Sequence, residues 1–250
     1  MAREVTVDCQ GVWFRLDLRD DVQREIFFNI YEQEDLQQAL DLIPSGGTCI
    51  DVGANNGAFA LRLAKKVGEL GVVHALEPDP DILARLETNC RLNGFESFVK
   101  CHALAVSNAN GSVPFYGSDH NHSGWGSLAK FEDIAAGSRA VKTVTLDSFL
   151  AAQRIGRVDF LKVDVEAHEP ELLEGARASL MARVFRYILI EFNGIRLAQR
   201  GKSLEDVVTP LAAAGYKATR IRVELLQKMQ DGLAAPENIC TNFLFEIPGQ

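Results

Sequence analysis

The amino-acid sequence predicts an α/β protein with a doubly wound, mostly parallel sheet, preceded by a short N-terminal β-hairpin and helix. Short apolar runs alternate with amphipathic segments along most of the 250 residues. The run at 48–52 enters a turn that contains glycines, and the run at 72–76 ends at an acid. Such alternation forms parallel sheets that helices cover on both faces, with ligands bound at the carboxyl ends of the strands.

The first 44 residues form the predicted hairpin and helix. Apolar residues alternate with polar ones on both sides of the turn Gln10-Gly11, which predicts two short strands. A helix is expected over 33–42, where Leu36, Ala39 and Leu40 share one face. We expect residues 1–44 to pack on the core and residues 45–250 to form the ligand-binding domain.

The remaining elements follow from periodicity and from turn residues. Asp79-Pro80-Asp81 opens one helix and Asn93-Gly94 closes it, because proline and acids suit a helix start and glycine suits its end. Asp147 is expected to be the N-cap of a later helix. The expected strands are 48–52, 72–76, 98–103, 113–116, 141–146, 158–163, 187–190, 216–223 and 241–247, and the other helices are 57–67, 147–152, 169–179 and 204–214.

Charge and hydropathy exclude several classes of protein. The formal net charge is −8, from 34 acidic and 26 basic residues, so a phosphate backbone is a poor partner and we expect no nucleic acid. No apolar run approaches the length of a membrane span, and the first residues lack the apolar stretch of a signal peptide. We therefore expect a cytoplasmic protein that acts on a small molecule.

The segment from Cys49 to Gly57 carries the main functional signal. Gly53 and Gly57 lack a Cβ atom, so a ligand can approach the turn closely. Glu77 ends the next strand, where an acid can bind ribose hydroxyls. The turn reads G-x-x-x-G, and Asp51 directly before it would repel a pyrophosphate. S-adenosylmethionine has a sulfonium and an ammonium group instead, so it suits this turn; a merely structural β–α turn is the alternative.

Four ordered motifs then resemble the FkbM-type methyltransferases. They are IDVGANNGAF at 50–59, ALEPDPDILARLETNCRLNG at 75–94, VTLDSFL at 144–150 and DFLKVDVEAHEPELLEGA at 159–176. The resemblance implies a Rossmann-like, seven-stranded sheet with an antiparallel last strand, S-adenosylmethionine as methyl donor, and a hydroxyl of a natural product, sugar or lipid as acceptor. Asn56 and Ala167 depart from the family pattern, which more often has an apolar residue and a glycine there.

The expected cofactor contacts combine the residues with the resemblance. Asp51 is assigned to the methionine amino group and Asn56 to its carboxylate. The resemblance further suggests that Tyr31 and Glu32 line the methionine pocket, and the adenine is expected after the third core strand. The full set of predicted cofactor-binding residues is Asp51, Gly53, Asn55, Asn56, Gly57, Glu77, Pro78, Ala103 and Asp164.

Catalysis is assigned to the segment after the strand 158–163. Asp164 falls at the carboxyl end of that strand and points to the ligand crevice. Methylation of a hydroxyl requires that its proton leaves, and a histidine takes protons near neutral pH. We expect His168 to be the general base, oriented by Glu166 or Glu169; alternatively, His168 and Glu169 only cap the helix before Pro170. Lys162 is expected to pair with a carboxylate inside the sheet.

Two further interpretations concern neighbouring segments. Asp164, Glu191 and Asn193 could present oxygens to Mg²⁺; alternatively, Glu191 hydrogen-bonds the acceptor, and we expect no metal. The loop 117–126 could close over the cofactor. In that loop, His120 or His122 could replace His168 as the base, and Trp125 could stack on adenine or on the substrate.

The leading hypothesis is thus an S-adenosylmethionine-dependent O-methyltransferase. A nicotinamide-dependent dehydrogenase is the alternative enzyme, although Asp51 and the missing third glycine argue against it. A non-catalytic cofactor-binding module is the other alternative.

Overall fold

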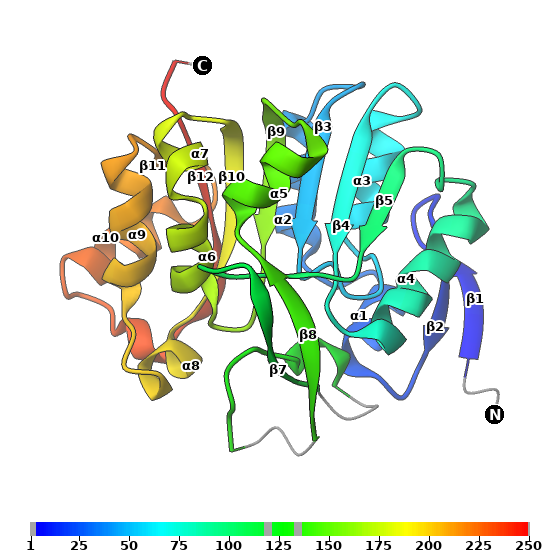
Figure 1. The fold of residues 1–250 in the computed structure, drawn as a ribbon, viewed down its shortest axis with the longest axis horizontal. Coiled ribbons are helices and arrows are strands. Elements are labelled where there is room, and N and C mark those ends of the chain that lie inside the picture. Colours follow the sequence, from blue (N-terminus) through cyan, green and yellow to red (C-terminus); the bar gives the residue numbers. More distant parts are fainter. Residues whose placement is uncertain (1–3, 118–121, 133–136, 250) are drawn as a thin grey trace.

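The computed structural model describes residues 4–117, 122–132 and 137–249. Its centre is a seven-stranded sheet in the order β11-β12-β10-β9-β3-β4-β5 (Figure 1). β12 runs antiparallel to both of its neighbours and the other strand pairs are parallel, so the predicted sheet is confirmed. The strands are β3 (Thr48–Val52), β4 (Val72–Leu76), β5 (Val99–His102), β9 (Val158–Val163), β10 (Phe185–Asn193), β11 (Lys217–Ala218) and β12 (Cys240–Glu246).

Helices cover both faces of this sheet. Alternate side chains of each strand point to opposite faces, so each face carries apolar side chains that pack against helices. Ile50 and Val52 face one apolar cluster, and Cys49 faces the other. The first cluster includes side chains of α5 (Leu146–Gln153), α6 (Glu169–Gly175), α7 (Arg177–Met181), α9 (Leu204–Ala213) and α10 (Val223–Gln230). The second includes β1 (Glu4–Asp8), β2 (Trp13–Asp17), α1 (Asp21–Phe27), α2 (Gln33–Leu42), α3 (Ala60–Val67) and α4 (Pro80–Asn93).

A second, three-stranded sheet lies beyond the carboxyl edge of the main one. It consists of β6 (Ala105–Val106), β8 (Ser138–Val144) and β7 (Gly111–Tyr116), in that order. Figure 1 shows β7 and β8 projecting below the central strands. The short helices near this edge are η1 (Ser123–Trp125), α8 (Gly194–Gln199) and η2 (Pro236–Asn238). The loops after β3, β4, β9 and β10 therefore face a common space beside this small sheet.

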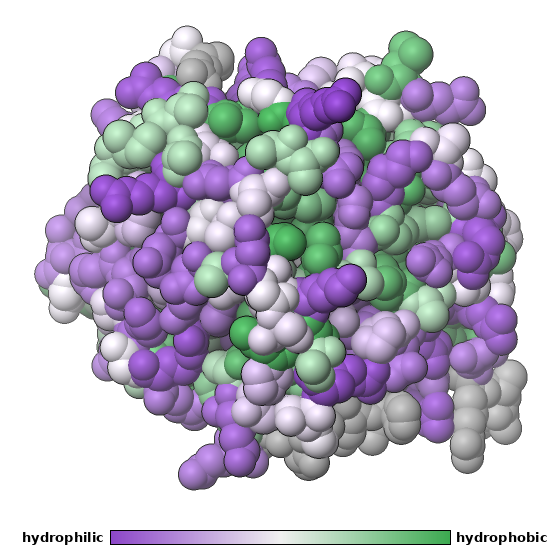
Figure 2. Space-filling view, viewed as in Figure 1, coloured by the Kyte–Doolittle hydropathy of each residue, from purple (hydrophilic) through white to green (hydrophobic). Residues whose placement is uncertain are grey.

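The surface reflects the same layering. Hydrophilic residues cover the side of the molecule that α9 and α10 form, and hydrophobic residues show near the middle of this face, over the central strands (Figure 2). Among the described residues, no helix is both long enough and apolar enough to cross a bilayer.

Several predicted elements need correction. α1, α8 and α10 are helices that periodicity did not predict, and the expected strand 216–223 is reduced to β11 because Val223 already begins α10. The expected helix 169–179 is divided into α6 and α7 at Ala176. Asp147 was wrongly predicted as a cap of its own helix: the Thr145 side chain caps α5, and Asp147 accepts hydrogen bonds from two backbone N–H groups at the start of α7.

Candidate active site

A cavity of about 370 Å³ opens at the carboxyl ends of β3, β4, β9 and β10. Its volume lies within the range of about 300–1,000 Å³ that is usual for small-molecule sites. Residues at or after the ends of the four strands form its floor, and residues of α1, β6 and β7 and the segment 123–128 form its walls. This is the position at which open parallel sheets bind ligands.

The glycine turn after β3 forms part of the floor. Gly53 has φ +81°, and a Cβ atom there would lie 1.7 Å from the carbonyl oxygen of Asp164. Gly53 is therefore required for the close approach of two neighbouring strand ends. Gly57 has φ +97° but does not line the cavity, and its missing Cβ makes room for Leu86 of α4. The expected ligand approach is thus possible at Gly53, whereas Gly57 serves packing.

Glu77 at the end of β4 is held rigidly by the backbone. Its two carboxylate oxygens accept hydrogen bonds from the N–H groups of Asn55, at 3.0 Å, and of Asp79, at 2.8 Å. Burial raises the pKa of Glu77 to about 8, although these two hydrogen bonds oppose the shift. Glu77 and Pro78 line the cavity, as does Asn55, whose φ is +49°. These residues form a preorganised rim that can accept hydrogen bonds from a diol.

Asp51 lies below the cavity floor rather than in its lining. It is almost fully buried, and neither of its carboxylate oxygens has a hydrogen-bond partner among the described residues. Burial raises the pKa of Asp51 to about 6, and the nearby Lys162 ammonium opposes this shift. Lys162 stands opposite Asp51 in the β3–β9 register and donates to Asp164 at 2.8 Å, so it pairs inside the sheet as predicted.

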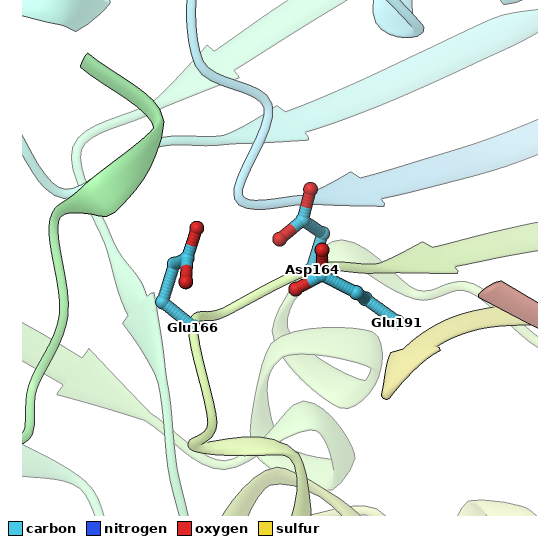
Figure 3. Close-up of side chains that lie close together, drawn as sticks. All are labelled: Asp164, Glu166 and Glu191. Atoms are coloured by element: carbon cyan, nitrogen blue, oxygen red, sulfur yellow. The ribbon is translucent and has the colours of Figure 1, made fainter. Parts of the chain in front are cut away.

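Three carboxylates meet on the β9–β10 side of the cavity. Asp164 follows β9, Glu166 belongs to the loop behind it, and Glu191 lies in β10; we call these three residues the carboxylate cluster. One carboxylate oxygen from each lies within 4.8 Å of the others, and Figure 3 shows the carboxylate groups turned toward a common space. Among the described residues, this is the set of His, Cys, Asp and Glu side chains that could hold a cation.

A strained turn places Glu166 in this cluster. Glu166 and Ala167 are consecutive non-glycine residues with φ of +53° and +67°, a conformation that L-residues avoid. Ser127 donates to the carbonyl oxygen of Glu166 at 2.8 Å, and the Arg196 guanidinium lies 3.6 Å from its carboxylate. Burial raises the pKa of Glu166 to about 8, and the Asp164 carboxylate raises it further. Such strain is typical of functional positions.

The same turn carries His168 away from the cavity. His168 is buried outside the cavity lining, with Nε2 2.9 Å from the Ser107 hydroxyl and Nδ1 3.6 Å from Glu171. Burial lowers the pKa of His168 to about 4. Neither predicted orienting residue is among the polar partners of His168: Glu166 lies near Arg196, and Glu169 accepts from the Val165 N–H. The placement of His168 therefore does not support its expected role as the base.

Other predicted residues are divided between the cavity and its surroundings. Tyr31 and Glu32 line the cavity. Asn56 is buried below it and its side chain has no hydrogen-bond partner among the described residues. Ala103 is exposed outside the lining. Asn193 caps α8 by accepting from the Arg196 N–H, so its side chain does not join Asp164 and Glu191 in the metal set that was considered as a possibility.

The loop over the cavity is tied to α1. His122 Nδ1 lies 2.5 Å from an Asp21 carboxylate oxygen, and the His122 and Trp125 rings are stacked with centroids 4.5 Å apart. Trp125 lines the cavity, as does Asp21. The predicted alternative base His120, together with Asp119 and Asn121, lies outside the described residues.

Sequence reasoning missed the apolar wall of the cavity. Leu104, Ala105 and Val106, directly after β5, line it together with Phe115 and Leu128. The available signal was the expected strands 113–116 and 141–146, whose pairing with 105–106 the sequence did not reveal. This wall can cover the planar face of an adenine, one or two residues beyond the predicted Ala103.

The charge of the lining fits S-adenosylmethionine. The described lining contains seven carboxylate side chains and no Lys, Arg or His. A ligand with phosphate groups would be repelled there, whereas a sulfonium and an ammonium group would be attracted. Glu77 would hold the ribose of this cofactor, and the carboxylates would face its positive end.

Comparisons with known proteins agree with this chemistry. The model of the methyltransferase FkbM domain matches residues 51–218. The hexuronic acid methyltransferase AglP of Haloferax volcanii is 25% identical over 193 residues, covering 77% of this chain and 70% of AglP. The methyltransferase sdnD of Sordaria araneosa is 28% identical over 212 residues, covering 73% of this chain and 78% of sdnD.

The fold has solved counterparts as well. A structure from Clostridium thermocellum, assigned as an rRNA methylase, superposes with a TM-score of 0.50 at 10% sequence identity. It covers 85% of this chain and 93% of that one, which shows a shared fold. The family match spans most of the chain and removes the dehydrogenase alternative. The chain therefore belongs to the FkbM methyltransferase family, and its methyl donor is S-adenosylmethionine.

Proposed function

We propose that this protein methylates a hydroxyl oxygen of a small molecule, and that Glu166 accepts the hydroxyl proton. The observation that carries the proposal is the carboxylate cluster beside the cofactor rim. A carboxyl group whose pKa is about 8 is matched to proton transfer near neutral pH. Unlike His168, Glu166 lines the cavity.

The proposed roles follow the strand ends. Glu77 holds the ribose hydroxyls, the turn at Gly53 and Asn55 contacts the methionine portion, and Leu104 and Ala105 cover the adenine. S-adenosylmethionine supplies an electrophilic methyl group. The acceptor oxygen attacks the methyl carbon and forms the new C–O bond as the S–C bond breaks. The electron pair of the S–C bond stays on sulfur, and the hydroxyl proton passes to Glu166.

The substrate class draws support from a relative. AglP is by its name a methyltransferase for a hexuronic acid, and a sugar offers several hydroxyl groups to the carboxylates of this cavity. Trp125, part of the lining, can stack on the apolar face of a sugar ring. A sugar or another polyhydroxylated compound is thus the proposed acceptor.

The test is a methyl-transfer assay with purified protein and a panel of hydroxylated compounds. We expect release of S-adenosylhomocysteine, a product heavier by one methylene unit, and a methyl ether that survives alkaline hydrolysis. Glu166→Gln should reduce turnover at least about 100-fold, the size of a general-base contribution, whereas His168→Asn should keep most of it. Methylation confined to amines or carboxylates would contradict the proposal.

A further inference from the structure

The cavity has a charge that methyl transfer alone does not require. Its described lining has seven carboxylates and no basic side chain. S-adenosylmethionine brings two positive groups and one carboxylate, so it balances only part of this charge. The seven residues are Asp21, Glu25, Glu32, Glu77, Asp164, Glu166 and Glu191.

Several of the lining carboxylates have local compensation. Asp164 pairs with Lys162, Glu166 lies near Arg196, and Glu77 accepts two backbone N–H groups. Glu32 accepts from the Asn242 side-chain amide at 2.8 Å, although its Oε2 has no partner among the described residues; Glu191 lacks an N–H or O–H partner at both oxygens. Its Oε2 is buried without a hydrogen-bond partner among the described residues, and its Oε1 has only the Cys240 thiol at 3.6 Å. A buried carboxylate oxygen without a partner is costly, and we infer that a ligand satisfies it.

The strand order places Glu191 away from the cofactor-binding residues. The order β10-β9-β3-β4-β5 puts Gly53 and Glu77 at the ends of β3 and β4, which we call the cofactor half of the cavity. The carboxylate cluster occupies the ends of β9 and β10, which we call the acceptor half. A cofactor that spans β3 to β5 would present its methyl group toward the acceptor half.

We propose, on the basis of the methyltransferase function above, that Glu166 and Glu191 make the acceptor half selective for charge. It admits neutral polyols and acceptors with an amino group, such as an amino sugar, and it rejects acceptors that present a carboxylate or a phosphate there. When these two carboxyl groups are ionised, an anion within about 4 Å meets strong repulsion, whereas hydroxyl and ammonium groups donate hydrogen bonds to them. An ammonium group also favours their ionised form, which burial alone disfavours. By this inference the substrate differs in charge from the hexuronic acid of the relative's name.

Calorimetric binding of two cofactor analogues tests this inference without knowledge of the acceptor. S-adenosylhomocysteine has no group at the position of the methyl group, and sinefungin has an ammonium there. We expect the parent protein to bind sinefungin at least about tenfold more tightly than S-adenosylhomocysteine, the effect of one hydrogen bond between charged groups. In the double variant Glu166→Gln, Glu191→Gln the preference should fall below about threefold.

The ratio of the two affinities distinguishes the loss of the carboxylate charge from a general loss of folded structure. Affinity for S-adenosylhomocysteine should stay near the parent value in each single variant and in the double variant, which shows that the cofactor half is intact. Glu205→Gln removes an exposed carboxylate of α9 outside the cavity and is the matched control. It should leave both affinities unchanged.

Two results would overturn the inference. One is equal affinity of the parent protein for the two analogues. The other is Mg²⁺ binding, measured with the metal alone, that depends on Glu191 and abolishes the sinefungin preference, because the cluster would then be a cation site. The proposed function fails differently: the sinefungin preference would persist while no hydroxyl compound is methylated.

Discussion

In the cofactor half of the cavity, Glu77 is fixed by two backbone N–H groups, and the turn at Gly53 is packed against the neighbouring strand end. In the acceptor half, Glu191 has a buried oxygen without a partner and Glu166 lies in a left-handed turn. Glu77 is thus satisfied within the protein, whereas Glu191 is not. The comparison indicates that the cofactor half is preorganised for the cofactor, whereas the acceptor half is strained and is completed by the methyl acceptor.

The largest effect is expected where the two halves touch, at Gly53→Ala. The added Cβ would lie 1.7 Å from the Asp164 carbonyl oxygen, in a backbone conformation unfavourable to alanine. We expect the free energy of unfolding to fall by about 3 kcal/mol or more, from overpacking and backbone strain together. Chemical denaturation with an optical probe would measure this loss.

Gly94→Ala is the control for that variant. Gly94 has a similar φ of +69° at the end of α4, but its Cβ would meet no atom within 4 Å. Its cost should be limited to the backbone term of about 1 kcal/mol. Equal losses in the two variants would show that the contact between the halves is unimportant.

Glu77→Ala sharpens the role of the cofactor half. Loss of the carboxylate removes the proposed hydrogen bonds to the ribose and should weaken binding of S-adenosylhomocysteine by about 30-fold, or ~2 kcal/mol. Calorimetry would measure the affinity. Asp79→Ala disturbs the same helix start, since Asp79 caps α4, and should change affinity much less. Similar losses in both would point to the helix start instead of the carboxylate.

Glu191→Gln tests the acceptor half through the pH dependence of stability. Burial raises the pKa of Glu191, and its folded value thus exceeds its unfolded value. Such a group stabilises the fold below its unfolded pKa, and the contribution is lost as pH rises through the folded pKa. The ligand-free parent should therefore lose stability between about pH 5 and pH 8, with Glu166, whose pKa is about 8, acting in the same direction.

The amide side chain of Glu191→Gln cannot ionise, so this variant should lose less stability than the parent as the pH rises. We expect Glu191→Gln to be more stable than the parent by about 1 kcal/mol near pH 8 and nearly equal near pH 5. Thermal melts across this pH range would show the difference. A variant that is destabilised equally at every pH would mean that Glu191 is satisfied in the fold.

The smallest effect is expected at Ala167→Gly. Ala167 has φ +67°, which glycine adopts without a Cβ penalty, although glycine also has more freedom when unfolded. We expect a net gain of about 0.5 kcal/mol in the free energy of unfolding. A loss of stability would show that the buried Ala167 methyl group contributes more packing than its turn costs.

Local signals were sufficient for much of the fold. The strands 48–52 and 72–76 were predicted with their observed bounds. Each is a short apolar run, and the turn residues that follow it mark where the strand ends. Asp79-Pro80 and Gly94 similarly located α4. The helices α1, α8 and α10 were missed because each is short and its helical form depends on packing against the neighbouring elements.

The sequence by itself therefore determined most of the core strands and the longer helices, the glycine turn, and which strand ends carry acids. Only the tertiary structure decided which side chains share the cavity. The left-handed turn at Glu166 and Ala167 sends His168 to Ser107 and leaves Glu166 beside Glu191. Residue spacing cannot show this, because the direction of a side chain after a strand depends on two backbone angles that distant contacts, such as that of Ser127, hold in place.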